Sequence, residues 1–190
     1  MEIAGLVLAA GAGRRYGMPK ALVPYRGSLL VRRAVATLTE AGCVPTVVVV
    51  GAEAGRVRAS APELDFVDNP GWATGMASSL RLGLAALRGS AAEAVVVLLV
   101  DMPGVTPAAV RRIAGHATAA ELAMGGYGAR RGHPVLLGRD HWDGVAAAAT
   151  GDRGARDYLR AHDDALRVVP VDDVADDFDL DTPEQATRHA

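Results

Sequence analysis

The chain has 190 residues, half of them hydrophobic, which is the size of one ordinary domain with a sizeable apolar core. The 20 Lys and Arg against 22 Asp and Glu give a formal net charge of -2, which argues against a protein held to nucleic acid by bulk charge. No apolar run approaches the ~20 residues of a membrane helix, and the single Cys43 excludes an internal disulfide.

We therefore expect one domain over residues 1–190, acting as a cytoplasmic monomer that binds neither nucleic acid nor membrane. No basic flank precedes the first apolar segment, so a signal peptide is not expected.

Strand and helix patterns alternate along the chain. The apolar run Ile3–Ala9 predicts a buried strand, and Ser28–Ala41 has the apolar spacing of a helix that Ser28 can cap and Gly42 ends. Further strands are predicted at Thr46–Val50, Asp65–Val67, Ala94–Val100, Val135–Leu137 and Leu166–Val169. Further helices are predicted at Gly75–Arg88, at Pro107–Ala120 with Thr106 as N-cap, and after the capping-box pattern Thr182-Pro183-Glu184-Gln185.

This alternation indicates a three-layer α/β fold with a mostly parallel sheet. The stretches Gly125–His133 and Gly151–Arg156 are rich in Gly and Arg and are predicted to be loops. Ligands of such folds bind beyond the carboxyl ends of the strands. The segments after Ala9, Gly51, Val67 and Val100 are therefore the first candidates for a site.

The loop after the first strand combines small and basic residues, in the run Ala9-Ala10-Gly11-Ala12-Gly13-Arg14-Arg15-Tyr16-Gly17-Met18-Pro19-Lys20. Small residues let backbone N–H groups approach a phosphate, and Arg14, Arg15 and Lys20 suit its oxygens. The loop is not a Walker A loop, because Ala21 follows Lys20, and the dinucleotide fingerprint needs glycine where Tyr16 stands. A generic strand-to-helix turn with solvated arginines is the alternative.

Asp101 directly follows the strand predicted at Ala94–Val100. A carboxylate at this end of a strand, near a phosphate-binding loop, is well placed for Mg²⁺. The alternative is a cap for the next helix, but Thr106 already fills that role.

Acidic residues gather near the C-terminus. Residues 161–190 carry nine Asp and Glu against two Arg, whereas residues 1–60 carry eight Lys and Arg against three Glu. Most of these acids are predicted to be solvated. Asp179 and Asp181 differ, because they flank Leu180 with the alternation of a strand and can both face one site.

The segment before the helix at Gly75–Arg88 carries polar side chains. Asn69, Ser78 and Ser79 supply neutral donors and acceptors of the kind that read a base edge. The helix N-terminus near Gly75 favours an anion. An ordinary Asn-Pro turn with serine capping is the alternative.

Together, these motifs resemble one family. The run Leu8-Ala9-Ala10-Gly11-x-Gly13-x-Arg15-x-Gly17-x-Pro19-Lys20 is similar to the signature loop of the nucleotidyltransferases of the glycosyltransferase-A type, the MobA-like proteins. The segment 69–80, Asp101-Met102-Pro103 and the segment 179–184 are similar to further motifs of that family, and the likeness runs from Ala4 to about Gln185. Ala10 stands where the guanylyltransferase branch has glycine, so the chain most resembles the molybdenum cofactor cytidylyltransferase branch.

The resemblance implies a Rossmann-like α/β/α nucleotidyltransferase fold with a mixed, mostly parallel sheet. It implies transfer of CMP from CTP to the phosphate of molybdopterin, with release of pyrophosphate. Asp101 and either Asp181 or Asp179 would hold Mg²⁺, and Lys20, Arg15 and Asp101 would be catalytic. The nucleotide contacts would come from Ala9, Ala10, Gly11, Gly13, Arg14, Lys20, Asn69, Gly75, Ser78 and Ser79.

Two segments, 128–135 and 151–156, look like those that face the acceptor in this family. His133, Arg130, Asp152 and Arg156 are therefore expected at the acceptor, and both arginines suit a phosphate monoester. A structural role for His133 is the alternative.

Several other functions stay open. They are guanylyl transfer, sugar-phosphate nucleotidyl transfer, and a nucleotide-binding factor that delivers the cofactor to a molybdenum hydroxylase apoenzyme without transfer. A dinucleotide-binding domain is disfavoured by Tyr16 and Pro19.

Overall fold

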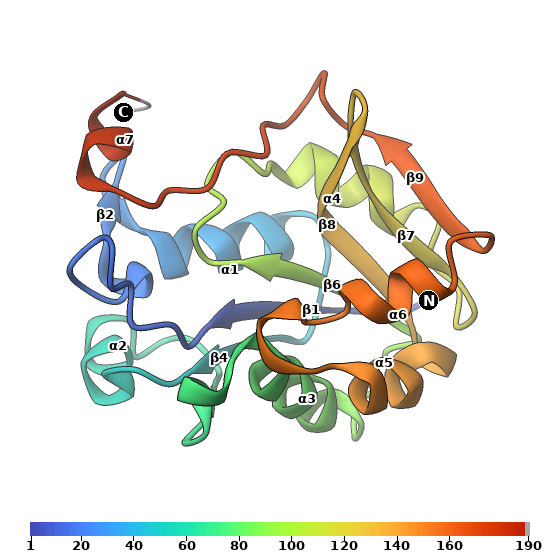
Figure 1. Cartoon of the computed structure of the whole chain (residues 1–190), viewed down its shortest axis with the longest axis horizontal. Helices are drawn as coiled ribbons and strands as arrows, with labels where there is room; N and C mark the ends of the chain where they lie inside the picture. Colours follow the sequence, from blue (N-terminus) through green and yellow to red (C-terminus); the bar gives the residue numbers. More distant parts are fainter. Residues whose placement is uncertain (189–190) are drawn as a thin grey trace.

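Within residues 1–188, which the computed structural model describes, a seven-stranded sheet carries helices on both faces (Figure 1). Its strands are β1 (Ile3–Ala9), β4 (Thr46–Val50), β5 (Phe66–Asp68), β6 (Ala94–Leu99), β7 (Leu122–Tyr127), β8 (Arg130–Gly138) and β9 (Leu166–Pro170). A separate ribbon pairs β2 (Pro24–Tyr25) with β3 (Ser28–Leu29). The helices are α1 (Leu30–Glu40), α2 (Ala54–Ser60), α3 (Met76–Leu87), α4 (Pro107–Ala114), α5 (Trp142–Ala148), α6 (Arg156–Ala161) and α7 (Pro183–Arg188).

The sheet order is β5-β4-β1-β6-β8-β7-β9. Strand β8 runs antiparallel to β6 and β7, and the other neighbours pair in parallel. The predicted three-layer fold with a mixed, mostly parallel sheet is therefore confirmed. The central strands β1 and β6 are buried along most of their length, as expected for strands covered on both faces.

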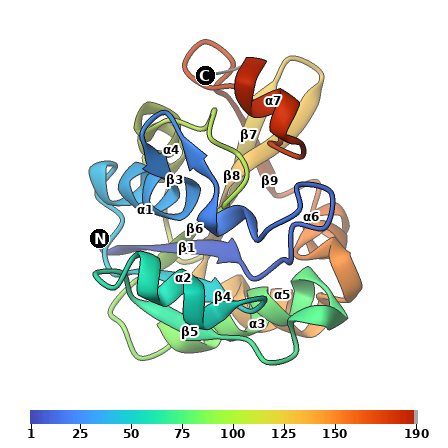
Figure 2. The same cartoon turned by 90° about the vertical axis from the view of Figure 1, so that its left-hand side faces the viewer.

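Two apolar layers enclose the sheet. Helices α1 and α4 cover one face, and α3, α5 and α6 cover the other, as Figures 1 and 2 both show. Side chains of β1 alternate between the layers, with Val7 packed on the α1 side and Leu6 on the α3 side. No helix among the described residues has the length and apolar character needed to span a membrane.

Several predicted boundaries are confirmed. Strands β1 and β4 span the predicted residues, and the Thr106 hydroxyl accepts the Ala109 N–H as the N-cap of α4. The capping box of α7 is also present, because the Gln185 side chain accepts the Thr182 N–H while the Thr182 hydroxyl accepts the Gln185 N–H.

Two predicted helix boundaries are wrong. Ser28 does not cap α1, because Arg26 and Gly27 adopt positive φ and turn the chain so that Ser28 pairs with Tyr25 in the ribbon. Helix α4 ends at Ala114 instead of Ala120, since the N–H of Gly115 closes the last turn onto Arg111 and Ile113.

The predicted loop at Gly125–His133 is instead the β7–β8 hairpin, with its turn at Gly128 (φ 62°). A β-carbon on Gly126 would lie 2.9 Å from Val168, and one on Gly125 would lie 2.9 Å from the His133 carbonyl oxygen. Close packing of neighbouring strands therefore requires glycine here, although glycine carries little strand signal in a sequence. The sequence patterns also did not predict α2, α5 and β7.

Candidate functional site

Two adjoining cavities open where β1 and β6 end. The loop cavity, of about 330 Å³, lies against the glycine-rich segment between β1 and α1. The α6 cavity, of about 520 Å³, extends from there across β6 and β8 to α6. The two cavities share Leu8, Met76, Leu99 and Asp152, so molecules bound in each would meet at this boundary.

The glycine-rich segment forms one wall of the loop cavity. Its lining includes the predicted phosphate-binding residues Ala9, Ala10, Gly11, Gly13, Arg14, Arg15 and Lys20. Gly13 has φ 59°, its carbonyl oxygen accepts the N–H groups of Tyr16 and Gly17, and a β-carbon there would lie 1.9 Å from the Met18 carbonyl oxygen. The tight turn therefore requires glycine at position 13.

Lys20 lies between two carboxylates in this cavity. Its Nζ donates to Asp101 Oδ2 at 2.7 Å and to Asp181 Oδ1 at 2.5 Å, and Arg15 Nη1 lies 3.0 Å from Asp181 Oδ2. Two cations and two carboxylates thus form one compensated cluster. It joins Lys20 of the first loop to Asp101, 81 positions later, and to Asp181, 161 positions later in the chain.

The pKa directions follow from this cluster. Burial by itself lowers the pKa of Lys20, but Asp101 and Asp181 outweigh burial and raise it, so the ammonium stays charged. Its hydrogen bond in turn lowers the pKa of Asp181, which stays ionised. Asp179 differs, because burial and then the charges of Asp101 and Asp181 raise its pKa.

The structure places the two candidate metal ligands near the C-terminus, Asp179 and Asp181, in different cavities. Asp181 lines the loop cavity with Asp101, whereas Asp179 lines the α6 cavity. The N–H of Leu180 donates to the Asp101 carbonyl oxygen at 2.8 Å, which brings both candidates to the end of β6.

The two carboxylates of the cluster could hold a divalent metal ion. Asp101 and Asp181 already hold one cation, the Lys20 ammonium, between their oxygens. Among the described residues no group of three or more His, Cys, Asp or Glu side chains forms a metal cage. Mg²⁺ does not need one, because it binds through one or two carboxylates together with substrate phosphates and water.

Only some of the polar residues around the start of α3 reach the loop cavity. Gly75 and Ser79 line the loop cavity, but Asn69 and Ser78 do not. The buried Asn69 amide donates to Ser78 Oγ at 2.8 Å and to Ser79 Oγ at 2.9 Å. Asn69 is thus in a position to orient Ser79 from behind the cavity wall.

The expected acceptor residues lie around the α6 cavity. His133 and Arg156 line it, and Asp152 lines both cavities while accepting the Met76 N–H at the start of α3. His133 Nδ1 lies 3.0 Å from the Val97 carbonyl oxygen, and burial lowers the pKa of the ring, which is therefore neutral. Arg130 lies outside the lining and pairs with Asp177.

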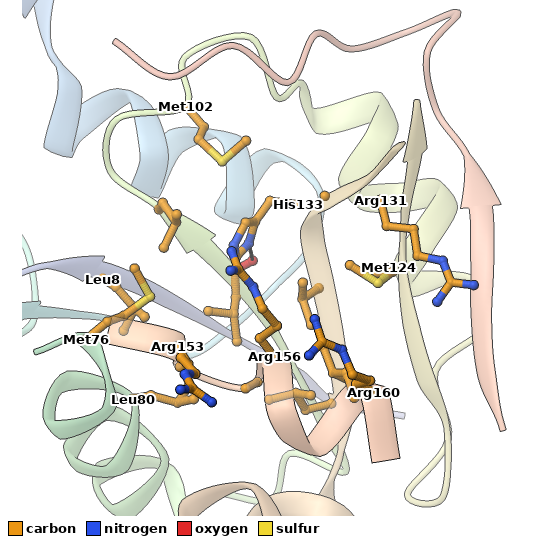
Figure 3. A pocket seen from close by; sticks show the side chains of 18 of the residues that line it. Leu8, Met76, Leu80, Met102, Met124, Arg131, His133, Arg153, Arg156 and Arg160 are labelled. Atoms are coloured by element: carbon orange, nitrogen blue, oxygen red, sulfur yellow. Dashed lines mark hydrogen bonds between the residues drawn. The ribbon is translucent and has the colours of Figure 1, made fainter. Parts of the chain in front are cut away.

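Most residues that line the α6 cavity were not predicted from the sequence, and four of them stand out. Met76, Met102, Met124 and Arg160 all line it (Figure 3). The methionines give an apolar, adaptable surface. The sequence carries no signal for their convergence, whereas the spacing of Arg156 and Arg160 would have placed both on one helix face.

Comparison with known proteins identifies the family. The model of the MobA-like NTP transferase domain matches residues 5–166. This chain belongs to the MobA-like NTP transferase family. It is 36% identical over 196 residues to the nicotine blue oxidoreductase of Paenarthrobacter nicotinovorans, covering 98% of this chain and 95% of that protein. It is 33% identical over 199 residues to the molybdenum cofactor guanylyltransferase of Rhodobacter capsulatus, covering 99% and 95%.

Solved structures agree with this assignment. Rv0371c of Mycobacterium tuberculosis H37Rv superposes with a TM-score of 0.84 at 32% identity, covering 99% of this chain and 97% of that one. A complex of the same protein with manganese has a TM-score of 0.82 at 30% identity, covering 100% and 98%. This MobA-like NTP transferase therefore has the α/β nucleotidyltransferase fold of its family.

Proposed function

We propose that this MobA-like protein transfers CMP from CTP to the phosphate of a molybdopterin-type acceptor. The observation that carries the proposal is the Lys20 ammonium held between Asp101 and Asp181, in a cavity that adjoins a larger one. Nucleotidyl transfer needs cations for a triphosphate, carboxylates for a metal, and room for a second substrate. The two cavities supply these three elements.

The triphosphate would lie against the glycine-rich loop. Backbone N–H groups near Gly11 and Gly13 cradle it, and Arg14, Arg15 and Lys20 neutralise its charge. Asp101 and Asp181 would hold Mg²⁺, which when bound would offset charge that develops on the phosphate oxygens. Ser79, oriented by Asn69, faces the nucleoside.

The acceptor would lie in the α6 cavity. One oxygen of its phosphate attacks the α-phosphorus in line, the bond from that phosphorus to the bridging oxygen breaks, and pyrophosphate leaves with the electron pair. A phosphate monoester is already ionised at neutral pH, so no side chain has to remove a proton from it. The neutral His133 ring and Arg156 then serve to orient the acceptor.

The choice of CTP rests on Ala10, which stands where the guanylyltransferase branch has glycine. The relative from Rhodobacter capsulatus carries a guanylyltransferase name and supports the GTP alternative. A molybdenum hydroxylase apoenzyme would be the recipient of the product.

The deciding experiment measures pyrophosphate release from CTP, GTP, ATP and UTP in turn, with Mg²⁺ and with or without molybdopterin. We expect release from CTP only when the acceptor is present. Asp101→Asn is the matched inactive control, because a lost metal ligand slows transfer about a hundredfold or more. Release from GTP alone would assign guanylyl transfer, and nucleotide binding without release from any of the four would favour a delivery factor.

An oxidoreductase is the second candidate. The identity of 36% to the nicotine blue oxidoreductase favours it, and so do the apolar, methionine-lined walls of the α6 cavity, which suit a flat aromatic compound. The loop lacks the dinucleotide fingerprint at Tyr16 and Pro19, which speaks against a nicotinamide cofactor site of the Rossmann type. Oxidation of NADH or NADPH with a quinone dye, with no pyrophosphate release, would select this candidate.

A further inference from the structure

Two arginines of the α6 cavity form a basic wall of their own, although the lining also contains Asp152, Asp163, Asp177 and Asp179. Arg156 and Arg160 lie four positions apart on α6, so both project from one face of the helix, and both line the cavity (Figure 3). Neither has an ion pair within residues 1–188, whereas the other two arginines of the lining do, Arg131 with Asp163 and Arg153 with Asp157.

This arrangement is unfavourable in the protein alone. Like charges four positions apart on a helix repel each other, whereas Arg153 and Asp157 at the same spacing attract. Each guanidinium also presents a fork of N–H donors that fits a carboxylate, phosphate or similar oxyanion. An anion bound between Arg156 and Arg160 would replace repulsion by two charge-assisted contacts.

The basic wall is separate from the triphosphate site. Lys20, Arg14 and Arg15 line only the loop cavity, and Arg156 and Arg160 line only the α6 cavity. The surface of the α6 cavity also includes apolar side chains from three strands and two helices, namely Leu80, Val97, Met124, Val135 and Leu159. The cavity thus offers an apolar surface with two arginines that are unpaired within the described residues, while two of its four aspartates, Asp163 and Asp177, are held in ion pairs with Arg131 and Arg130.

We propose that Arg156 and Arg160 form an anion subsite for a second negatively charged group of the acceptor, distinct from the phosphate that reacts. The inference rests on the proposed function, in which the reacting phosphate must reach the triphosphate at the boundary with the loop cavity. The acceptor class is then a flat molecule that carries one anion at the transfer end and another at the α6 end. Arg160, next to Arg156, becomes a specificity-determining residue.

A binding experiment tests the subsite without any transfer reaction. The loop cavity is filled with Mg²⁺ and a CTP analogue whose α–β bridging oxygen is a methylene group. Two fluorescent probes are then titrated, 1-naphthalenesulfonate and its uncharged counterpart 1-naphthalenemethanol. We expect the sulfonate to bind about tenfold more tightly, the equivalent of a hydrogen bond to a charged group.

Variants show which side chains cause the tighter binding of the sulfonate. Arg156→Gln with Arg160→Gln should abolish it, Arg156→Lys with Arg160→Lys should keep most of it, and Arg153→Gln should leave it unchanged, because Arg153 already pairs with Asp157. All of these side chains are exposed, so unfolding midpoints close to wild type are expected. An unchanged preference in the double Gln variant, or no preference in the wild type, would overturn the subsite.

Kinetics separate this inference from the proposed function. In a transferring enzyme, Arg160→Gln should raise the KM for the acceptor about tenfold and leave the KM for CTP unchanged. A protein that releases no pyrophosphate from any nucleotide contradicts the proposed function, whereas the probe titrations still decide whether the two arginines bind an anion.

Discussion

The Lys20 ammonium, with Arg15, balances the charges of Asp101 and Asp181 in the loop cavity. A metal and a triphosphate would act on these same four groups. The metal needs the carboxylates, and the phosphates need the two cations. Binding of either ligand would therefore change the environment of the other, and Lys20 would be the residue through which the two ligands are coupled.

Lys20→Met should affect the two ligands in opposite directions. Without nucleotide, the carboxylates lose the cation between them, and the affinity for free Mn²⁺ should rise about tenfold, while the affinity for Mg–CTP should fall by a similar factor. Isothermal titration calorimetry measures both. Arg14→Met is the control, because Arg14 lines the same cavity without an ion pair to a described residue and should lower only the nucleotide affinity. Weaker Mn²⁺ binding in Lys20→Met would contradict the coupling.

His133 should make stability depend on pH. Burial lowers its pKa in the folded state, so as the pH falls through 6.5 the unfolded chain takes up a proton that the folded chain does not. The free energy of unfolding should therefore decrease from pH 7 to pH 5, roughly across the range where histidine ordinarily titrates. Urea unfolding at several pH values measures this slope, and His133→Asn should reduce it. An equal slope in both proteins would show that His133 does not contribute.

At the scale of elements, short backbone contacts hold the site together. Strand β6 ends beside the C-terminal segment, where the Asp101 carbonyl oxygen accepts the Leu180 N–H. The start of α7 holds the next residue, because the Asp181 N–H donates to Gln185 Oε1 at 2.6 Å. The β1–α1 loop forms a third wall of the site, in addition to these two segments of the chain. Its tight turn requires glycine at position 13.

Gly11 and Gly13 of that loop should respond differently to the same substitution. Gly13→Ala places a β-carbon against the Met18 carbonyl oxygen at a positive φ, and should lower the free energy of unfolding by about 1–3 kcal/mol. Gly11→Ala meets no atom within 4 Å and should leave stability within about 0.5 kcal/mol of wild type. Thermal or urea unfolding checks both. Equal stability of the two variants would contradict the packing of the loop.

At the scale of the whole molecule, the near-zero net charge conceals two poles. The first sixty residues are basic and the last thirty are acidic, and the fold brings them together where Lys20 and Arg15 meet Asp181. Leu180 anchors the acidic end, since its side chain is fully buried in the layer that contains α1 and α4.

Leu180→Ala should therefore weaken both the fold and the site. The cavity it leaves should lower the free energy of unfolding by about 2–5 kcal/mol. The affinity for Mn²⁺ should also fall, because the residue that aligns Asp181 is lost. Val168→Ala, at a side chain that is 37% exposed and remote from the carboxylates, is the control; it should lower the free energy of unfolding by about 1 kcal/mol and leave the affinity for Mn²⁺ unchanged. Normal Mn²⁺ affinity in a folded Leu180→Ala protein would contradict this anchoring.

Local patterns predicted the elements that are stabilised locally. The β-branched run of β4 and the Thr106 cap need no distant partner to be recognised, and both are present as predicted. The β7–β8 hairpin was missed because its glycines are required by packing, against the His133 carbonyl oxygen across the hairpin and against Val168 of β9, which lies elsewhere in the chain. Short α2 and α5 were missed for a related reason, since their stability comes from the layers they join.

The sequence by itself determined the fold class, the glycine-rich loop and the candidate carboxylates, because each depends on residue type and spacing over a short stretch. Only the tertiary structure decided how these parts combine. It placed Asp181 in the loop cavity and Asp179 in the α6 cavity, and it turned Asn69 away from both. The reason is that a cavity is made by side chains from several distant elements, and their distances are set by packing across the whole sheet.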